Sequence, residues 1–119
     1  MSDILKVTAV IPAAGSGRRM QKNISKQFLR IGSKPILFYT LRQFEICMLV
    51  DEVILVVAAD DLAYAEQEIV ERYDLKKVHK IISGGGERQD SVYAGLTAIA
   101  DKPDLVIIHD GVRPFVSVD

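Results

Sequence analysis

Four short apolar runs, separated by longer amphipathic stretches, constrain the fold of this chain more than any other feature of its sequence. The runs are Val7–Ile11, Val53–Ala59, Val78–Ile82 and Leu105–Ile108. Each is rich in valine and isoleucine and is nearly continuous, rather than alternating between apolar and polar residues. Such continuity is typical of strands buried on both faces, as in a parallel sheet. The sequence therefore predicts a parallel β core.

Helix signals lie between these runs. Ser33-Lys34-Pro35 offers a cap candidate and an early-turn proline for the first helical stretch, and the second opens with acidic residues at Asp60 and Asp61. Either Asp90 or Ser91 can cap the third. Parallel strands that alternate with helices need crossover connections. We therefore expect an α/β fold with a Rossmann-like, doubly wound, mostly parallel sheet and helices on both faces.

The composition narrows the function classes. The chain has 119 residues, 49% of them apolar and 26% charged, which suits one globular domain. Its formal net charge of -1 disfavours a dedicated nucleic-acid binder, which usually carries a basic excess. Nothing before the first run looks like a signal peptide, and no window approaches the roughly 20 apolar residues that span a bilayer. We expect a soluble, cytoplasmic protein that binds neither nucleic acid nor membrane.

We expect Pro12–Ile31 to be a loop of about 20 residues, whereas junctions in α/β folds usually take 2–6. It opens with Pro12-Ala13-Ala14-Gly15-Ser16-Gly17-Arg18-Arg19-Met20. Glycines let several N–H groups point inward, and arginine forks suit phosphate oxygens. Together with Lys26 the segment predicts a phosphate site. The alternative is a plain turn with two solvated arginines, and the absence of Gly-Lys-Ser/Thr excludes a P-loop.

A second glycine-rich segment, Gly84-Gly85-Gly86-Glu87-Arg88-Gln89-Asp90-Ser91-Val92, follows the third run. Three glycines leave room for a flat base, and Ser91 near a helix start can hydrogen-bond to a base edge. A flexible turn followed by an ordinary N-cap is the competing interpretation. Arg88 can equally be a structural arginine that braces the loop.

The fourth run ends in His109-Asp110-Gly111-Val112-Arg113-Pro114-Phe115. A carboxylate at the carboxyl end of a buried strand is costly unless it is paired or faces a site. Magnesium prefers oxygen ligands, so Asp110 is a candidate metal ligand beside phosphates. The alternative is a structural ion pair between Asp110 and Arg113.

These three motifs together resemble the 2-C-methyl-D-erythritol 4-phosphate cytidylyltransferase family. The family pattern contains Pro-Ala-Ala-Gly-x-Gly-x-Arg-Met, then Lys-Gln-Phe/Tyr, then Gly-Gly-x-Glu-Arg-x-Asp-Ser-Val and His-Asp-x-x-Arg-Pro. The resemblance implies a fold of the nucleotide-diphospho-sugar transferase type. It also implies transfer of a cytidylyl group from CTP to methylerythritol phosphate with release of pyrophosphate, in non-mevalonate isoprenoid biosynthesis.

The resemblance also implies roles for individual residues. Arg19 and Lys26 would stabilise the charged pentacoordinate phosphorus. Asp110 would lie beside the Mg²⁺ or other divalent cation and the polyol phosphate, and Arg113 would shape the substrate side. The residues that would contact CTP are Ala13, Ala14, Gly15, Gly17, Gly85, Gly86 and Ser91. Some family members have Asp where this chain has Gly86, so only backbone contacts remain at that position.

Three other interpretations stay open at this point. A ribitol-5-phosphate cytidylyltransferase has similar motifs, although it tends toward Leu-Ala-Gly-Gly where this chain has Pro12-Ala13-Ala14-Gly15. A sugar-1-phosphate nucleotidyltransferase is more remote. The resemblance covers about half of the family's length, so residues 1–119 are expected to be the nucleotide-binding part of one α/β domain that lacks its C-terminal portion. Such a part can bind CTP without catalysis, and the homodimer is implied only for full-length members.

Overall fold

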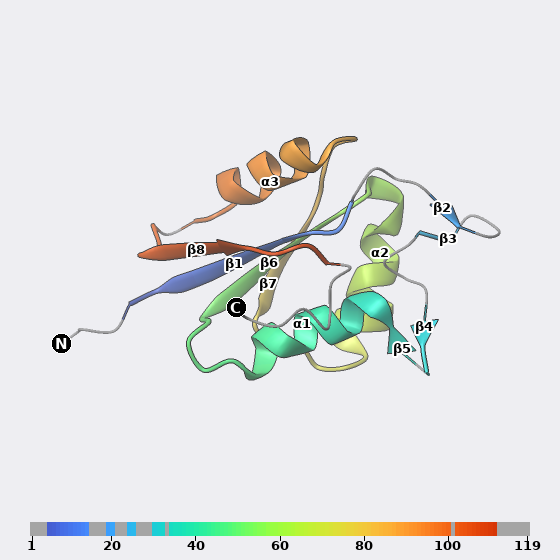
Figure 1. Cartoon of the computed structure of the whole chain (residues 1–119), viewed down its shortest axis with the longest axis horizontal. Helices are drawn as coiled ribbons and strands as arrows, with labels where there is room; N and C mark the ends of the chain where they lie inside the picture. The colour runs from blue at the N-terminus through green and yellow to red at the C-terminus, as the bar shows by residue number, and fades with distance from the viewer. Residues whose placement is uncertain are drawn as a thin grey trace.

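The computed structural model describes residues 5–14, 19–20, 24–25, 30–32, 34–100 and 102–111. Its centre is a sheet of four parallel strands in the order β7-β6-β1-β8 (Figure 1). These strands are β1 (Val7–Pro12), β6 (Glu52–Val57), β7 (Val78–Ser83) and β8 (Leu105–Ile108). Each coincides with one of the four apolar runs to within two residues at either end. The predicted parallel sheet is confirmed.

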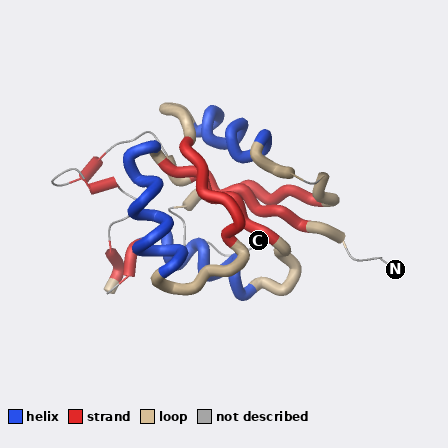
Figure 2. Tube along the Cα trace, turned by 180° about the vertical axis from the view of Figure 1, so that it is seen from behind, coloured by secondary structure: helices blue, strands red, loops and turns tan. Residues whose placement is uncertain are grey.

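Helices cover both faces of this sheet, as the sequence predicts. The helical elements are α1 (Ile36–Ile46), η2 (Ala59–Asp61), α2 (Leu62–Tyr64), η3 (Ala65–Glu71) and α3 (Arg88–Thr97). Elements η2, α2 and η3 follow one another directly and form one helical stretch that starts as a 3₁₀ turn and widens to a π-helix. Figures 1 and 2 show α1 and this stretch on one side of the sheet and α3 on the other.

The two central strands, β1 and β6, are continuously apolar because both of their faces are buried. Ala9 and Ile11 of β1 belong to a core cluster with Leu41 of α1 and Ile69 of η3, and all four side chains are fully buried. Val10 points to the other face, where it packs in a second cluster on the α3 side. Because both faces are covered, neither set of side chains has a solvent side to place polar residues on.

Gly95 allows α3 to lie close against this second face. A Cβ atom at this position would overlap the Cγ1 atom of Val10, and it would lie 3.3 Å from the Cγ2 atom of Val56. The glycine weakens the helix by about 1 kcal/mol relative to alanine. Its place in the middle of α3 is therefore explained by the close approach of the helix to β1 and β6.

The outer strands differ from the prediction that every strand is buried on both faces. Within the described residues, β7 and β8 contain no fully buried side chain, and Leu105 and Ile108 of β8 are 50% and 40% exposed. Position in the sheet is the physical reason, because an edge strand has a neighbour on one side only. An apolar run predicts a strand but not whether that strand is central.

The segment predicted as the loop Pro12–Ile31 contains regular structure, so that prediction is wrong in part. Strand β2 (Arg19–Met20) pairs antiparallel with β3 (Ile24–Ser25), and β4 (Arg30–Ile31) pairs antiparallel with β5 (Lys34–Pro35). Helix α1 follows β5 directly, with Pro35 as its N-cap residue. Two-residue strands carry no periodicity, which is why the sequence pattern does not reveal them.

Candidate functional site

The strand order creates a switch point between β1 and β8. After β1 the chain adds β6 and β7 on one side of the sheet, and then returns to place β8 on the other side of β1. Ligands of open α/β sheets bind at the carboxyl ends of the strands at such a point. Ala13 and Ala14 directly follow β1, Gly84 directly follows β7, and Asp110 comes shortly after β8. The three predicted motifs therefore share one edge of the sheet.

Backbone hydrogen bonds hold the ends of the strands together. The N–H of Ala13 donates to the carbonyl of Val56 at 2.7 Å, and the N–H of Gly111 donates to the carbonyl of Pro12 at 3.2 Å. Ala13 and Ala14 are each only 4% exposed. A Cβ atom at Gly111 would lie 2.9 Å from that of Ala13, so the small residues in both motifs let the two segments lie side by side.

The glycine-rich segment after β7 packs against the start of α3. The N–H of Gly84 donates to the carbonyl of Val57 at 2.9 Å. A Cβ atom at Gly84 would overlap the Oγ atom of Ser91, and one at Gly85 would press on the side chain of Asp90, whereas one at Gly86 would meet open space. The first two glycines are therefore required by packing, and the third is not.

Helix α3 begins earlier than the sequence indicates, so the prediction that Asp90 or Ser91 caps it is wrong. Glu87 is the N-cap residue, and its side chain accepts a bond from the N3 backbone while the carboxylate of Asp90 accepts one from the N–H of Glu87. This capping box places Ser91 inside the helix. The Ser91 side chain is fully buried, and within the described residues its Oγ atom has no hydrogen-bond partner.

An ion pair links this segment to the end of β8. The Nε atom of Arg88 donates to the Oδ1 atom of Asp110 at 2.8 Å, and the Asp110 side chain is 25% exposed. The alternative partner considered from the sequence, Arg113, lies outside the described residues. The sequence missed this contact, although two signals pointed to it: Arg88 and Asp110 both follow strand ends at the same edge, and their charges are opposite.

The first motif is described only in part. Its backbone pairing sets Arg19 opposite Ser25, the residue that precedes Lys26 in the sequence. The two residues predicted to act on the phosphorus thus belong to, or directly follow, the facing strands β2 and β3. Other predicted site residues lie outside the described part of the chain: Gly15, Gly17, Lys26 and Arg113.

Comparison with known proteins decides between the families that the motifs leave open. The family model of 2-C-methyl-D-erythritol 4-phosphate cytidylyltransferase matches residues 7–119. The chain belongs to this family. The 2-C-methyl-D-erythritol 4-phosphate cytidylyltransferase of Clostridium perfringens strain SM101 is 54% identical over 112 residues, which cover 94% of this chain and 49% of the relative. The chain thus spans about half the length of the curated relatives it matches.

Solved structures agree with this assignment. The 4-diphosphocytidyl-2C-methyl-D-erythritol synthase of Anaerococcus prevotii superposes with a TM-score of 0.79 at 36% identity, over 97% of this chain and 47% of that one. The Francisella tularensis 2-C-methyl-D-erythritol 4-phosphate cytidylyltransferase gives a TM-score of 0.69 at 31% identity, over 95% and 47%. The motifs led us to expect a fold of the nucleotide-diphospho-sugar transferase type, and the chain has the fold of the cytidylyltransferase family.

One carboxylate at the site is a candidate ligand for a divalent cation. Asp110 places a carboxylate at the switch point, and in the described part of the chain no group of three or more His, Cys, Asp or Glu residues could hold a metal ion. Magnesium is commonly bound by one or two carboxylates together with substrate phosphates. Asp110 is therefore a residue that could hold a divalent cation such as Mg²⁺ beside a triphosphate.

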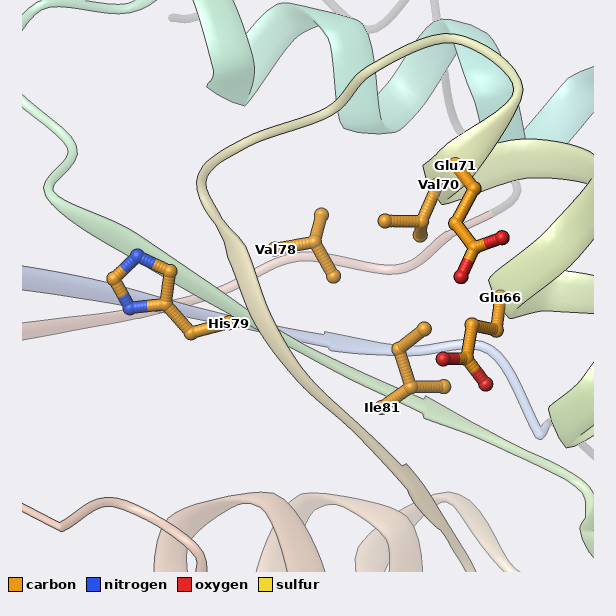
Figure 3. A pocket seen from close by; sticks show the side chains of 6 residues that line it. All are labelled: Glu66, Val70, Glu71, Val78, His79 and Ile81. Atoms are coloured by element: carbon orange, nitrogen blue, oxygen red, sulfur yellow. The ribbon is translucent and has the colours of Figure 1, made fainter.

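A separate cavity lies between the helical stretch and the outer strand β7. It has a volume of about 240 Å³ and is lined by Glu66, Val70, Glu71, Val78, His79 and Ile81. Figure 3 shows side chains of the helical stretch facing β7, with the ring of His79 on the far side of that strand. None of the residues that line this cavity belongs to the three motifs. Within the described residues, no helix is long and apolar enough to cross a membrane.

Proposed function

We propose that the chain forms the CTP-binding part of a 2-C-methyl-D-erythritol 4-phosphate cytidylyltransferase. This enzyme transfers the cytidylyl group of CTP to its polyol phosphate, giving 4-diphosphocytidyl-2-C-methyl-D-erythritol and pyrophosphate in non-mevalonate isoprenoid biosynthesis. The observation that carries the proposal is the meeting of three family motifs at the carboxyl ends of β1, β7 and β8. A cytoplasmic location and a homodimer of the whole enzyme belong to the same proposal.

The reaction asks for positioning and charge neutralisation more than for covalent work by the protein. A phosphate oxygen of the polyol phosphate attacks the α-phosphorus of CTP. A new phosphorus–oxygen bond forms, and the bond to the β-phosphate oxygen breaks, which releases pyrophosphate. Negative charge grows on the oxygens around the α-phosphorus during this step. Arg19 and Lys26 supply the positive charges that stabilise it.

The remaining site residues divide into a base side and a phosphate side. Backbone groups of Gly85 and Gly86 and the hydroxyl of Ser91 recognise cytosine, and the segment from Ala13 onward follows the triphosphate. Ser91 is fully buried, so its contact with a base requires a shift of its rotamer or of the loop that covers it. Asp110 would hold the Mg²⁺ ion, and Arg113 would contact the polyol phosphate. When bound, the ion shields phosphate charge and acts as a Lewis acid.

The identity of the polyol substrate is tested by measuring pyrophosphate release by the whole enzyme, supplied with CTP, Mg²⁺ and one polyol phosphate at a time. Methylerythritol phosphate is expected to support release, and ribitol 5-phosphate is expected to support little. The sequence Pro12-Ala13-Ala14-Gly15 favours this order. Release with ribitol 5-phosphate alone would overturn the substrate assignment but not the cytidylyl transfer. Release with neither polyol phosphate would overturn the proposed activity.

A further inference from the structure

The contact between Arg88 and Asp110 lies at the edge of the sheet where the carboxyl ends of the strands meet. Arg88 follows the glycine-rich segment after β7, Asp110 follows β8, and these are the two outer strands of the sheet. The ion pair therefore links the start of α3 to the segment that follows β8. It joins the segment proposed to read the base to the carboxylate proposed to orient the metal.

The position of Arg88 is unfavourable for the helix itself. It is the first residue of α3, where the positive end of the helix dipole disfavours a cation by about 0.3–1 kcal/mol. The capping box formed by Glu87 and Asp90 fixes the backbone at this point, so the arginine side chain starts from a rigid base. A residue that breaks a local preference on a well-ordered backbone is expected where function requires it.

Asp110 in turn sits on an anchored backbone. The N–H of His109 donates to the carbonyl of Val10 at 3.1 Å, and the carbonyl of Gly111 accepts a hydrogen bond from the hydroxyl of Thr40 at 2.8 Å. With the residues on both sides held, the orientation of the carboxylate depends on the partners of its side chain. The charged hydrogen bond from Arg88 is 2.8 Å long, a strong contact of this class.

We propose that Arg88 is a positioning residue for Asp110. It fixes the carboxylate in the orientation that a Mg²⁺–CTP complex requires, and its positive charge offsets the repulsion between that carboxylate and the triphosphate. Partners that orient a ligating carboxylate typically contribute a factor of 10–100 to metal affinity or activity. This inference rests on the proposed function, because it assumes that CTP binds at the switch point.

The test is a calorimetric titration of CTP into the chain in the presence of Mg²⁺. Arg88→Met removes the charge and the hydrogen bond, and is expected to weaken binding on the order of tenfold. Arg88→Lys keeps the charge and is expected to recover most of this loss. Arg72→Met is the matched control, because the Arg72 side chain is also 57% exposed and pairs with a carboxylate, Glu68, at 3.3 Å. It is expected to bind CTP like the wild type.

A double-mutant cycle separates positioning from a general structural role. If Arg88 acts through Asp110, Arg88→Met in an Asp110→Asn background weakens CTP binding no further than Asp110→Asn alone. Thermal melting identifies any variant that fails to fold, and Arg88→Lys then carries the comparison. Equal CTP affinity of the wild type and Arg88→Met, or fully additive losses in the cycle, would overturn the positioning role alone. A wild-type chain that binds no CTP would overturn the proposed function and this inference with it.

Discussion

Gly84 and Ser91 touch so closely that no Cβ atom fits between them, because it would overlap the serine Oγ atom and lie 2.7 Å from the Cγ1 atom of Val56. This contact fixes the glycine-rich segment on the first turns of α3. The same three-glycine run contains Gly86, at which a Cβ atom meets open space. Two glycines of one motif therefore differ in their packing, which gives a matched pair of substitutions.

We predict that Gly84→Ala destabilises the fold by about 1–3 kcal/mol, because overpacking forces the loop or α3 to move. Gly86→Ala is expected to leave stability unchanged or to raise it by up to about 1 kcal/mol, since it restricts the unfolded chain without a clash. Chemical denaturation of the two variants measures the difference. Equal stability of both would contradict the packing role of Gly84.

Ser91 and Thr40 each carry a buried hydroxyl, and removing the two hydroxyls is expected to change stability in different ways. The Ser91 Oγ atom has no hydrogen-bond partner within the described residues, whereas the Thr40 hydroxyl donates to the carbonyl of Gly111 at 2.8 Å. Ser91→Ala is expected to keep or raise stability and to weaken CTP binding. Thr40→Val is expected to lose about 1–3 kcal/mol, because it leaves a buried carbonyl unpaired. A loss of stability in Ser91→Ala similar to that in Thr40→Val would show that the serine hydroxyl is structurally satisfied.

Glu52 predicts how stability changes in acid. Burial raises the pKa of this carboxyl group. Hydrogen bonds from Thr8 and His79 and the charge of Lys6 together have the larger, opposite effect, so the pKa lies below its ordinary value of 4.5. A lowered pKa in the folded state means that the ionised group stabilises the fold above the unfolded value. This contribution is lost as the pH falls through the lowered pKa.

Glu52→Gln is therefore expected to lower the free energy of unfolding at pH 7 by about 1–2 kcal/mol. The gap to the wild type should close as the pH is lowered below 4.5. Glu68→Gln is the control, since Glu68 forms an exposed pair with Arg72 that contributes at most about 0.5 kcal/mol. Urea melts across the acid range provide the comparison. A gap that is independent of pH would show that the charge of Glu52 does not contribute.

The sequence predicts the skeleton of this fold because its signals are long and periodic. The apolar runs locate all four strands of the sheet, and the amphipathic stretches locate the helices. Features decided by a few residues are missed, such as the pairing of β2 with β3 and the widening of the helix at η3. Local patterns cannot anticipate them, because tertiary contacts select these conformations.

The cap of α3 and the partner of Asp110 show the same limit at the site. Asp and Ser are the usual N-cap residues, so the sequence pointed to Asp90 or Ser91, while the structure uses Glu87 with Asp90 in a reciprocal box. Arg88 and Asp110 are 22 positions apart and meet only because the strand order brings both to one edge. The sequence motifs identify which residues gather at the site, but the contacts between them require the fold.

Arg19 is the residue whose loss should affect chemistry more than binding. Arg19→Ala in the whole enzyme is expected to reduce kcat on the order of 10²–10³-fold, because it removes a donor that stabilises charge in the transition state. Arg72→Ala is the control, because this exposed arginine pairs with Glu68 and belongs to none of the three motifs, and it is expected to retain most of the turnover. Steady-state pyrophosphate release measures both. Near-normal turnover of Arg19→Ala would remove this residue from the mechanism.

Nucleotide selectivity of the chain in solution tests the central claim most directly. Calorimetric titration with CTP and with UTP, each with Mg²⁺, compares two ligands that differ only on the base edge. A site that hydrogen-bonds to cytosine leaves its polar groups unpaired with uracil, so we predict saturable CTP binding at least about tenfold tighter than UTP binding. Equal affinity for the two nucleotides, or no saturable binding of CTP, would contradict the assignment of this chain as a cytidine-triphosphate site.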